Sequence, residues 1–294
     1  MTKSDNITKY YNQKGKLTLD NPAYKKLVDY YTHETLALDL NGSEDVTTKV
    51  LLDSNPIVQA NVMARQDGVI AGIQEAEYFL NNFDIQVKFL KKDGDLIVNK
   101  DIVLTLSGPI QSILTVERTM LNILQRMSGI ATNTHSITSK LGTYPLLCST
   151  RKTQWGLLDK RAVALGGGGT HRLGLYDFIL IKDNHLPYIS DLTSKAKKLN
   201  EKNIFWEIEA DTPEQVRKFV ELKPGAIMFD NFSTETITKL VSELGSINEN
   251  TIFEASGNIN IETIEEYGNT GVDVISMGAL THSVMSLDIG LDII

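Results

Sequence analysis

Six short apolar runs in the C-terminal half of the sequence each lead into residues that could carry chemistry. The runs span residues 145–148, 178–181, 204–208, 226–229, 252–253 and 272–275. The first run is followed by Arg151 and Lys152 and the second by Lys182, with His171 and Arg172 between them. Cations suit carboxylates and phosphates, because Arg presents a two-pronged donor and Lys a point charge. These residues predict a binding site for an anion.

The later runs end in acids and then in small residues. Glu207 and Glu209 lie at the third run, and Asp230 follows the fourth. Glu207 and Glu209 share one strand face, so spacing alone does not choose between them. Neighbouring carboxylates suit Mg²⁺ or sugar hydroxyls, and glycine turns after the last strands are where barrel enzymes commonly hold a phosphate. Those turns are Ser256-Gly257-Asn258 and Gly278-Ala279-Leu280. The pattern predicts a phosphate-bearing substrate with magnesium.

Several of these features are also compatible with an ordinary structural role. Arg151-Lys152 alone could be a solvated basic pair, residues 166–169 a flexible glycine turn, and His171 a hydrogen-bonded loop residue. Lys182 differs, because a lysine directly after Phe-Ile-Leu-Ile needs a partner if it is buried. Asp230 is interpreted in the same way. The sequence leaves His282 open, while structural roles are expected for His33, His135, His185 and the thiol of Cys148.

The elements that must position these groups alternate between strand and helix. Helix-compatible stretches at 212–222, 234–244 and 261–267 separate strands that lack polar alternation, which indicates a parallel sheet covered on both faces. No dinucleotide-binding fingerprint follows the first strand, and this favours a barrel over an open doubly wound sheet. In a parallel barrel the strand ends meet on one rim, so the cations and acids should converge there.

The N-terminal part has a different organisation. A helical pattern at 21–40 precedes short strand-like stretches at 57–64, 68–71, 85–89 and 101–106, with a helix at about 74–82. A long helix at 110–141 follows. We therefore expect an α+β domain over residues 1–112 and a barrel domain over 113–283, with residues 284–294 packing on the first domain.

Composition excludes some classes of protein. The 294 residues include 29 basic and 37 acidic side chains, a net charge of −8 that argues against nucleic acid or an acidic membrane as the main partner. A single cysteine permits no intrachain disulfide. The sequence has neither an apolar signal core at its start nor an apolar run of about 18 residues. A cytoplasmic protein is expected.

Together, these residues resemble the quinolinate phosphoribosyltransferase family, also called carboxylating nicotinate-nucleotide pyrophosphorylase. The resemblance extends from about residue 46 to the C-terminus. Its motifs are Val46-Thr47-Thr48, Glu117-Arg118-Thr119 with Asn122 and Gln125, Ser128-Gly129-Ile130-Ala131, Thr150-Arg151-Lys152-Thr153, residues 166–168 with His171-Arg172, and residues 181–185, 207–209, 229–231, 254–257 and 278–283.

The resemblance implies an N-terminal α/β sandwich domain, an open barrel of about six strands, and a homodimer in which Arg118 reaches the neighbouring pocket. The implied reaction transfers the phosphoribosyl group of phosphoribosyl pyrophosphate to quinolinate. The transfer releases pyrophosphate, and loss of CO₂ then gives nicotinate mononucleotide, a step of NAD biosynthesis. Mg²⁺ is the implied cofactor, held by Glu209 and Asp230 directly or through water.

By the same resemblance, the site residues fall into three sets. Catalytic roles are implied for Lys152, Lys182, Glu209 and Asp230. The implied quinolinate ligands are Arg118, Thr150, Arg151, His171, Arg172 and Lys182. The implied ligands of phosphoribosyl pyrophosphate are Lys152, Glu209, Asp230, Ser256, Gly257, Asn258, Gly278, Ala279, Leu280 and His282.

Two residues depart from the family pattern. Thr170 stands where Asn is frequent, and Trp155 stands where Pro is frequent. Neither change removes a charge that the chemistry requires. Three other functions stay open: a lyase with a Schiff base on Lys182, an enzyme that ribosylates nicotinate without releasing CO₂, and a silent phosphosugar sensor.

Overall fold

The computed structural model describes residues 2–294, which form two compact units. Unit 1 contains the residues up to Lys14, then 136–153 and 168–282; unit 2 contains 15–135, 154–167 and 283–294. Each unit is thus assembled from three separate stretches of chain. None of the helices described in 2–294 combines the length and apolarity that crossing a membrane requires.

Unit 1 is built on a six-stranded parallel sheet. The strands are β6 (Leu146–Cys148), β7 (Ile179–Ile181), β8 (Trp206–Ala210), β9 (Ala226–Asp230), β10 (Ile252–Ser256) and β11 (Val274–Ser276). Their order is β6-β11-β10-β9-β8-β7, with every neighbouring pair parallel. The first two strands in sequence therefore form opposite edges, and no described strand pair joins β6 to β7. This confirms the prediction of an open, incomplete α/β barrel.

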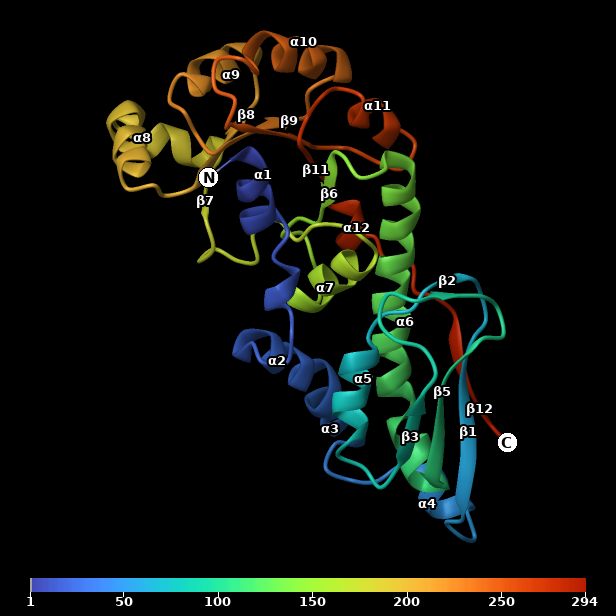
Figure 1. Cartoon of the computed structure of the whole chain (residues 1–294). Helices are drawn as coiled ribbons and strands as arrows, with labels where there is room; N and C mark the ends of the chain where they lie inside the picture. Colours follow the sequence, from blue (N-terminus) through green and yellow to red (C-terminus); the bar gives the residue numbers. More distant parts are fainter. Residues whose placement is uncertain (1) are drawn as a thin grey trace. The chain divides into compact units, whose positions relative to one another are not determined.

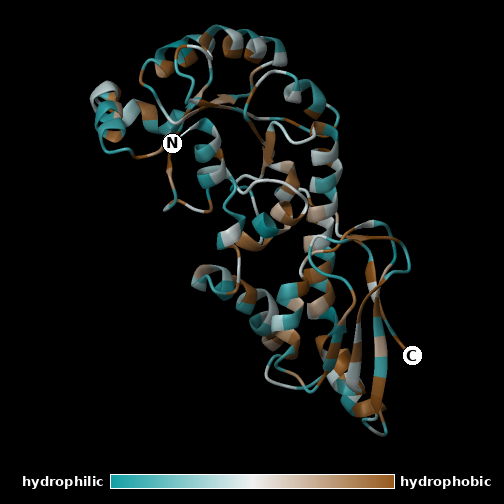
Figure 2. Ribbon diagram, viewed as in Figure 1, coloured by the Kyte–Doolittle hydropathy of each residue, from teal (hydrophilic) through white to brown (hydrophobic). Residues whose placement is uncertain are grey.

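Helices connect these strands along the outer face of the sheet (Figure 1). They are α8 (Leu192–Glu201), α9 (Pro213–Val220), α10 (Thr234–Leu244) and α11 (Ile264–Gly268). Helix α9 begins with a Thr212 capping box and Pro213 in its first turn, and it buries Val216, Phe219 and Val220. In Figure 2 hydrophobic residues concentrate in the strands, while the outer helices carry mixed colours. This is the pattern expected of amphipathic helices covering a buried parallel sheet.

The N-terminal segment also belongs to unit 1. It contains α1 (Lys3–Asn6) and a π-helix (Ile7–Tyr11). The ring of Tyr10 stacks on Phe205 at 4.0 Å, and the fully buried Tyr11 joins a core cluster with Cys148 and Phe178. The short helix α12 (Ala279–His282) and a 3₁₀-helix (Asp183–Tyr188) complete the unit.

Unit 2 contains an antiparallel sheet in the order β12-β1-β5-β3. Its strands are β1 (Ile57–Ala64), β3 (Gln86–Phe89), β5 (Ile102–Pro109) and the C-terminal β12 (Ile289–Ile293), and a separate ladder joins β2 (Gly68–Val69) to β4 (Leu96–Ile97). The helices are α2 (Pro22–Asp29), α3 (Thr35–Leu40), α4 (Val46–Leu51), α5 (Ile73–Leu80) and α7 (Leu157–Leu165); α6 (Ile110–Leu141) runs from this unit into unit 1.

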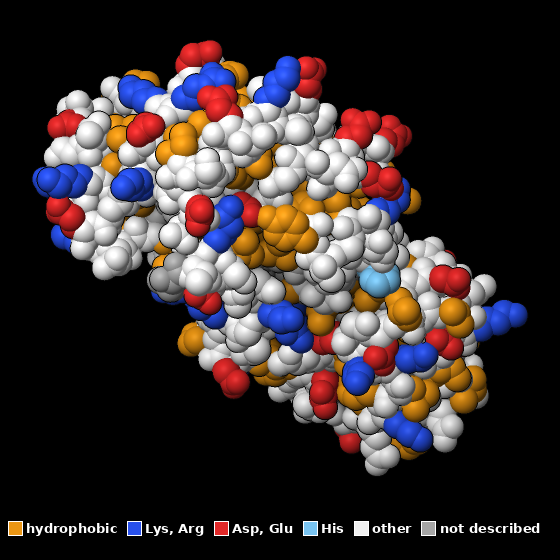
Figure 3. Space-filling model, turned by 45° about the horizontal axis from the view of Figure 1, so that its top comes forward, with side chains coloured by type: hydrophobic (Ala, Val, Ile, Leu, Met, Phe, Trp, Pro, Cys, Tyr) orange, Lys and Arg blue, Asp and Glu red, His pale blue; other side chains and the backbone are white. Residues whose placement is uncertain are grey.

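Some predicted elements differ in detail from the observed ones. The helix at 21–40 is divided into α2 and α3 by a π-helix at Tyr30–Glu34. Strand β8 lies two residues later than predicted. Strand β10 continues beyond the predicted run to Ser256, because it includes the buried polar residue Glu254, which a search for apolar runs cannot recognise. On the face in Figure 3, charges of both signs are interspersed without a single-sign patch.

Candidate active site

A pocket of about 370 Å³ opens at the C-terminal ends of the parallel strands of unit 1. The groups predicted from the strand ends converge there, since Arg151, Lys182, Glu209 and Asp230 all line it. The remaining lining residues are Thr150, Lys152, His171, Arg172, Leu180, Met228, Ser256 and Ser276. Cations and acids are therefore gathered at one end of one barrel.

Three cations come from the segments around β6. Arg151 and Lys152 are exposed, whereas Arg172 is only 8% exposed. Burial, reinforced by the charge of nearby Arg151, lowers the pKa of Arg172. The carbonyl of Lys152 accepts a 2.8 Å hydrogen bond from the Thr281 hydroxyl, which ties this loop to α12. Two neighbouring guanidinium groups in a partly buried wall form a strong receptor for a carboxylate.

The acids lie on β8 and β9, next to Lys182, which follows the neighbouring strand β7. The Lys182 ammonium donates a hydrogen bond to Glu209, which is 5% exposed. Burial raises the pKa of Glu209, and Lys182 opposes this effect. Carboxylate oxygens of Glu209, Asp211 and Asp230 lie within 4.8 Å of one another. An all-oxygen donor set of this kind fits Mg²⁺. Asp211 was not predicted, although its place two residues after Glu209 was the available signal.

The loops after β9 and β10 are interlocked by hydrogen bonds. The Asn258 amide donates to Asn231 Oδ1 at 2.9 Å, and the Asn231 amide donates to Asp230 at 2.7 Å. Gly257 has φ +90°, and a Cβ there would lie 2.3 Å from Asn231 Oδ1. Only glycine is compatible with both constraints. This local order fixes the direction of the Asp230 side chain.

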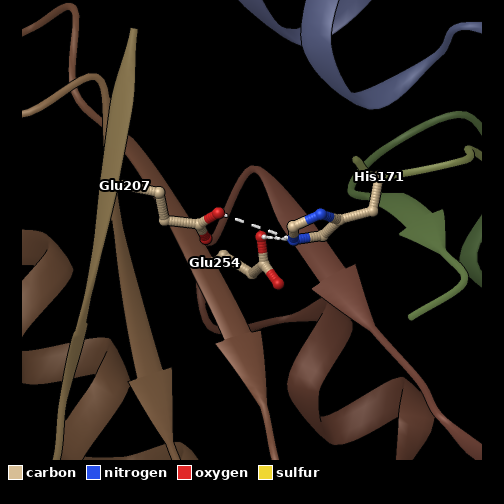
Figure 4. Close-up of side chains that lie close together, drawn as sticks. All are labelled: His171, Glu207 and Glu254. Atoms are coloured by element: carbon tan, nitrogen blue, oxygen red, sulfur yellow. Dashed lines mark ion pairs between the residues drawn. The ribbon is translucent and has the colours of Figure 1, made fainter. Parts of the chain in front are cut away.

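His171 reaches the floor of the pocket from the segment after the glycine turn. Its Nε2 lies 3.2 Å from Glu254 and 3.6 Å from Glu207, and these three buried side chains converge in Figure 4. Its Nδ1 accepts the backbone N–H of Arg172 at 2.7 Å. Of the two glutamates on β8, Glu207 therefore contacts His171, and Glu209 faces the pocket.

Some predicted residues are not part of the pocket lining. Arg118 lies exposed on α6 in unit 2. Six others follow lining residues in sequence without lining the pocket themselves: Gly257, Asn258, Gly278, Ala279, Leu280 and His282. A Cβ built at Gly278 would contact both Lys152 and His282, at 3.2 and 3.1 Å, so these three residues are neighbours.

Conversely, Leu180 and Met228 line the pocket without having been predicted, because an apolar residue near a strand end carries no sequence signal of its own.

The family motif at 128–131 has a structural role in unit 2. The Ser128 hydroxyl accepts the Ala71 N–H at 2.9 Å and donates to the Ala71 carbonyl. A Cβ at Gly129 would lie only 2.0 Å from the Met285 carbonyl oxygen, so α6 passes directly against the C-terminal segment there.

The two departures from the family pattern both make local contacts. Thr170 is buried and accepts the Gln13 N–H at 3.0 Å. Trp155 lies in unit 2, where its ring stacks on Tyr31 at 4.3 Å and receives the Arg126 guanidinium at 5.1 Å. Neither residue belongs to the lining of the pocket.

Comparison with known proteins matches the chain to two family models. Residues 45–128 match the N-terminal domain of quinolinate phosphoribosyl transferase, and residues 130–292 match its C-terminal domain. The probable nicotinate-nucleotide pyrophosphorylase (carboxylating) of Methanothermobacter thermautotrophicus is 39% identical over 262 residues, covering 86% of this chain and 94% of that protein. The Bacillus subtilis protein of the same name is 37% identical, with coverages of 92% and 93%.

The fold agrees with these sequence matches. The structure of the Francisella tularensis nicotinate-nucleotide pyrophosphorylase superposes with a TM-score of 0.84 at 34% identity, covering 92% of this chain and 96% of the other. That of the Ehrlichia chaffeensis enzyme gives 0.83 at 34% identity, with coverages of 92% and 98%. Sequence and fold therefore agree over both domains, and the chain belongs to the quinolinate phosphoribosyl transferase family.

Proposed function

We propose that this chain catalyses phosphoribosyl transfer from phosphoribosyl pyrophosphate to quinolinate, with decarboxylation to nicotinate mononucleotide, as a step of NAD biosynthesis. The observation that carries the proposal is one pocket that brings the cations Arg151, Arg172 and Lys182 together with the acids Glu209 and Asp230. A dicarboxylate needs such cations, and a ribosyl centre that gains positive charge needs such acids.

The pyridine carboxylates would bind at the cationic wall. Arg151 and Arg172 supply the paired donors, Thr150 a hydroxyl, and Lys182 a further charge. Lys182 is held in an ion pair with Glu209, whereas a Schiff base requires a lysine amine that can reach a carbonyl group. This contact makes the lyase alternative less favourable.

The phosphoribosyl donor would lie between Lys152 and the acids. Lys152 faces the pyrophosphate, while Glu209 and Asp230 meet the ribose hydroxyls and favour the cationic sugar as the bond to pyrophosphate breaks. Glu209, Asp230 and the adjacent Asp211 are the groups that would hold Mg²⁺. When bound, Mg²⁺ supplies charge neutralisation of the pyrophosphate. Ser256 and the turns at 257–258 and 278–280, with His282, would receive the 5′-phosphate.

Decarboxylation needs no further nucleophile. Once the ring nitrogen carries the ribosyl group, its positive charge stabilises the electron pair left on the adjacent carbon as the bond to the carboxylate breaks. CO₂ leaves, and the carbon then takes a proton from solvent. Orientation by the protein can supply about 7–11 kcal/mol of the barrier reduction.

The assembly belongs to the same proposal. A homodimer with shared sites would place Arg118 of one subunit in the pocket of the other, and the exposure of Arg118 on α6 supports this role. A single, buried cysteine is compatible with a reducing compartment such as the cytoplasm.

An Arg151→Ala variant tests the assigned quinolinate site. Because Arg151 is exposed, the variant should unfold as cooperatively as the wild type, while quinolinate binding measured by calorimetry should fall by about tenfold or more. Arg217→Ala, which removes an exposed arginine paired with Glu243, is the matched control. Near-normal turnover of Arg151→Ala would refute the role.

A further inference from the structure

Two buried carboxylates lie beneath the pocket, outside the machinery described above. Glu207 on β8 and Glu254 on β10 are each 0% exposed, and the charged group that meets their oxygens is His171, whose Nε2 lies 3.6 Å from Glu207 and 3.2 Å from Glu254. Burying two carboxylates with so few polar contacts is unfavourable, and an apolar side chain of similar volume would fill the same space at less cost. The pair therefore calls for a functional role.

His171 contacts both glutamates and also lines the pocket. Its Nε2 is 3.2 Å from Glu254 Oε2, and its Nδ1 accepts the Arg172 N–H at 2.7 Å. A ring nitrogen that accepts an N–H carries no proton, so the proton of a neutral His171 resides on Nε2 and faces the acids. Glu254 thus fixes both the tautomer and the orientation of the ring.

His171 is held in a backbone conformation that is unfavourable for a non-glycine residue. Its φ is +51°, in the left-handed region. The Tyr11 carbonyl accepts the N–H groups of Thr170 at 2.7 Å and His171 at 3.1 Å, and the His171 ring packs against the rings of Tyr11 and Phe178, at centroid distances of 5.0 and 5.5 Å. Strain of this kind persists where the surroundings over-determine it, and it concentrates at functional sites.

Arg172 follows His171 in the sequence. To bind a substrate carboxylate together with Arg151, its guanidinium must stay close to the positive charge of Arg151. Arg151 disfavours the charged form of Arg172, whereas Glu207 and Asp177 favour it. If the His171 ring were released, the Arg172 N–H would lose its acceptor and the left-handed turn would lose a restraint. The guanidinium could then move away from Arg151, and the carboxylate receptor would be lost.

We propose that Glu254, supported by Glu207, is a positioning residue for the pocket: it holds the His171 ring, which in turn holds Arg172 where the substrate carboxylate binds. The inference rests on the proposed function for the identity of that substrate. It assigns Glu254 no contact with either substrate.

Glu254→Met tests this role, because Met has a similar volume and removes the acceptor. We expect the KM for quinolinate to rise by about tenfold to a hundredfold, with the KM for phosphoribosyl pyrophosphate within about twofold of the wild type. Glu254→Gln retains an acceptor oxygen and should recover most of the loss. Glu243→Gln removes an exposed carboxylate and is the matched control.

A double-mutant cycle asks whether Glu254 acts through His171. In a His171→Phe background, Glu254→Met should add less than about twofold to the KM for quinolinate, because the intermediary is already gone. A full additional loss, an equal rise in both KM values, or an unchanged KM in the single Glu254→Met variant would each overturn the proposal.

Nitrogen-15 NMR of labelled histidine gives a readout that does not depend on turnover. The chain has five histidines, and His171→Phe assigns the signal. A wild-type signal with a proton on Nε2 and none on Nδ1 is expected, and a protonated Nδ1 would contradict the proposal even if Glu254→Met fails to fold. Absence of turnover by the wild type would instead count against the proposed function, leaving this spectrum as a separate test.

Discussion

At the residue scale, the chemistry depends on the placement of like and unlike charges around one pocket. Lys182 and Glu209 neutralise each other, while Arg151 and Arg172 are left side by side for an incoming anion. The identities of these residues could be predicted, because a charged group directly after a buried strand is costly unless it has a partner or a ligand. The choice between Glu207 and Glu209 could not be made from their spacing, since both lie on one face of β8. Their contacts distinguish them, because Glu207 lies against His171 and Glu209 pairs with Lys182.

The acids on β8 and β9 lead to a prediction about magnesium. Glu209→Gln and Asp230→Asn should each raise the Mg²⁺ concentration for half-maximal turnover by about tenfold or more, because each removes a charged oxygen ligand. A chelator should abolish turnover, and added Mg²⁺ should restore it. Titration of activity with Mg²⁺ measures the effect, with Glu235→Gln on the exposed face of α10 as control. Full turnover in the presence of the chelator would exclude the metal.

At the scale of elements, buried polar contacts hold the helices of unit 2 together. Arg161 on α7 contacts Glu75 on α5 at 3.1 Å and Asp93 at 3.0 Å, and Tyr24 on α2 donates to Glu75 at 2.7 Å. Burial raises the pKa of Glu75, and the Arg161 charge opposes that shift. The network is a set of paired charges whose members depend on one another.

Arg161→Met should therefore destabilise the protein in a pH-dependent way. The variant leaves Glu75 buried without its cation, at a cost of about 3–5 kcal/mol near pH 8. A raised carboxyl pKa means that the folded state binds more protons than the unfolded state, so stability falls as the pH rises above about 4.3. The loss should thus be smaller at pH 5 than at pH 8, because a raised pKa moves Glu75 toward its neutral form as the pH falls. Urea unfolding at both pH values measures it; equal losses would contradict the role assigned to the Arg161 charge.

Helix α6 makes a second element-scale prediction. Gly129→Ala places a methyl group against the Met285 carbonyl, where backbone must shift, and should lower the free energy of unfolding by about 1–3 kcal/mol or more. Gly15→Ala is the matched control, since nothing lies within 4 Å of a Cβ built at Gly15 and the change should be nearly neutral. Denaturant unfolding of the two variants compares them directly, and similar stabilities would show that α6 can move away.

The strands of the barrel could be predicted from apolar runs, but other elements could not. β12 and β4 carry no distinctive pattern, and they exist because β1 and β2 offer unpaired edges far away in the sequence. The chain of contacts from Glu254 through His171 to Arg172 is likewise a tertiary property. The local sequence specifies where a strand ends and which charged residue follows it. Which side chain that residue contacts across the barrel depends on the complete set of tertiary contacts.

At the scale of the whole molecule, the proposal of shared sites predicts complementation between inactive subunits. Arg118→Ala and Lys152→Ala should each be inactive alone. After subunit exchange in a 1:1 mixture, half of the dimers are mixed and each has one intact site, so activity should recover to about a quarter of the wild-type value. Exchange is verified by native mass spectrometry. Complete exchange without recovered activity would count against Arg118 in the partner's pocket.

The central proposal is that one pocket in the open barrel both ribosylates and decarboxylates a pyridine dicarboxylate. The decisive assay incubates the protein with phosphoribosyl pyrophosphate, Mg²⁺ and quinolinate labelled in the 2-carboxyl group, and follows CO₂, pyrophosphate and nicotinate mononucleotide together. Equimolar formation of all three products is expected. Formation of the nucleotide from nicotinate without labelled CO₂, or binding of both substrates without turnover, would contradict the proposal.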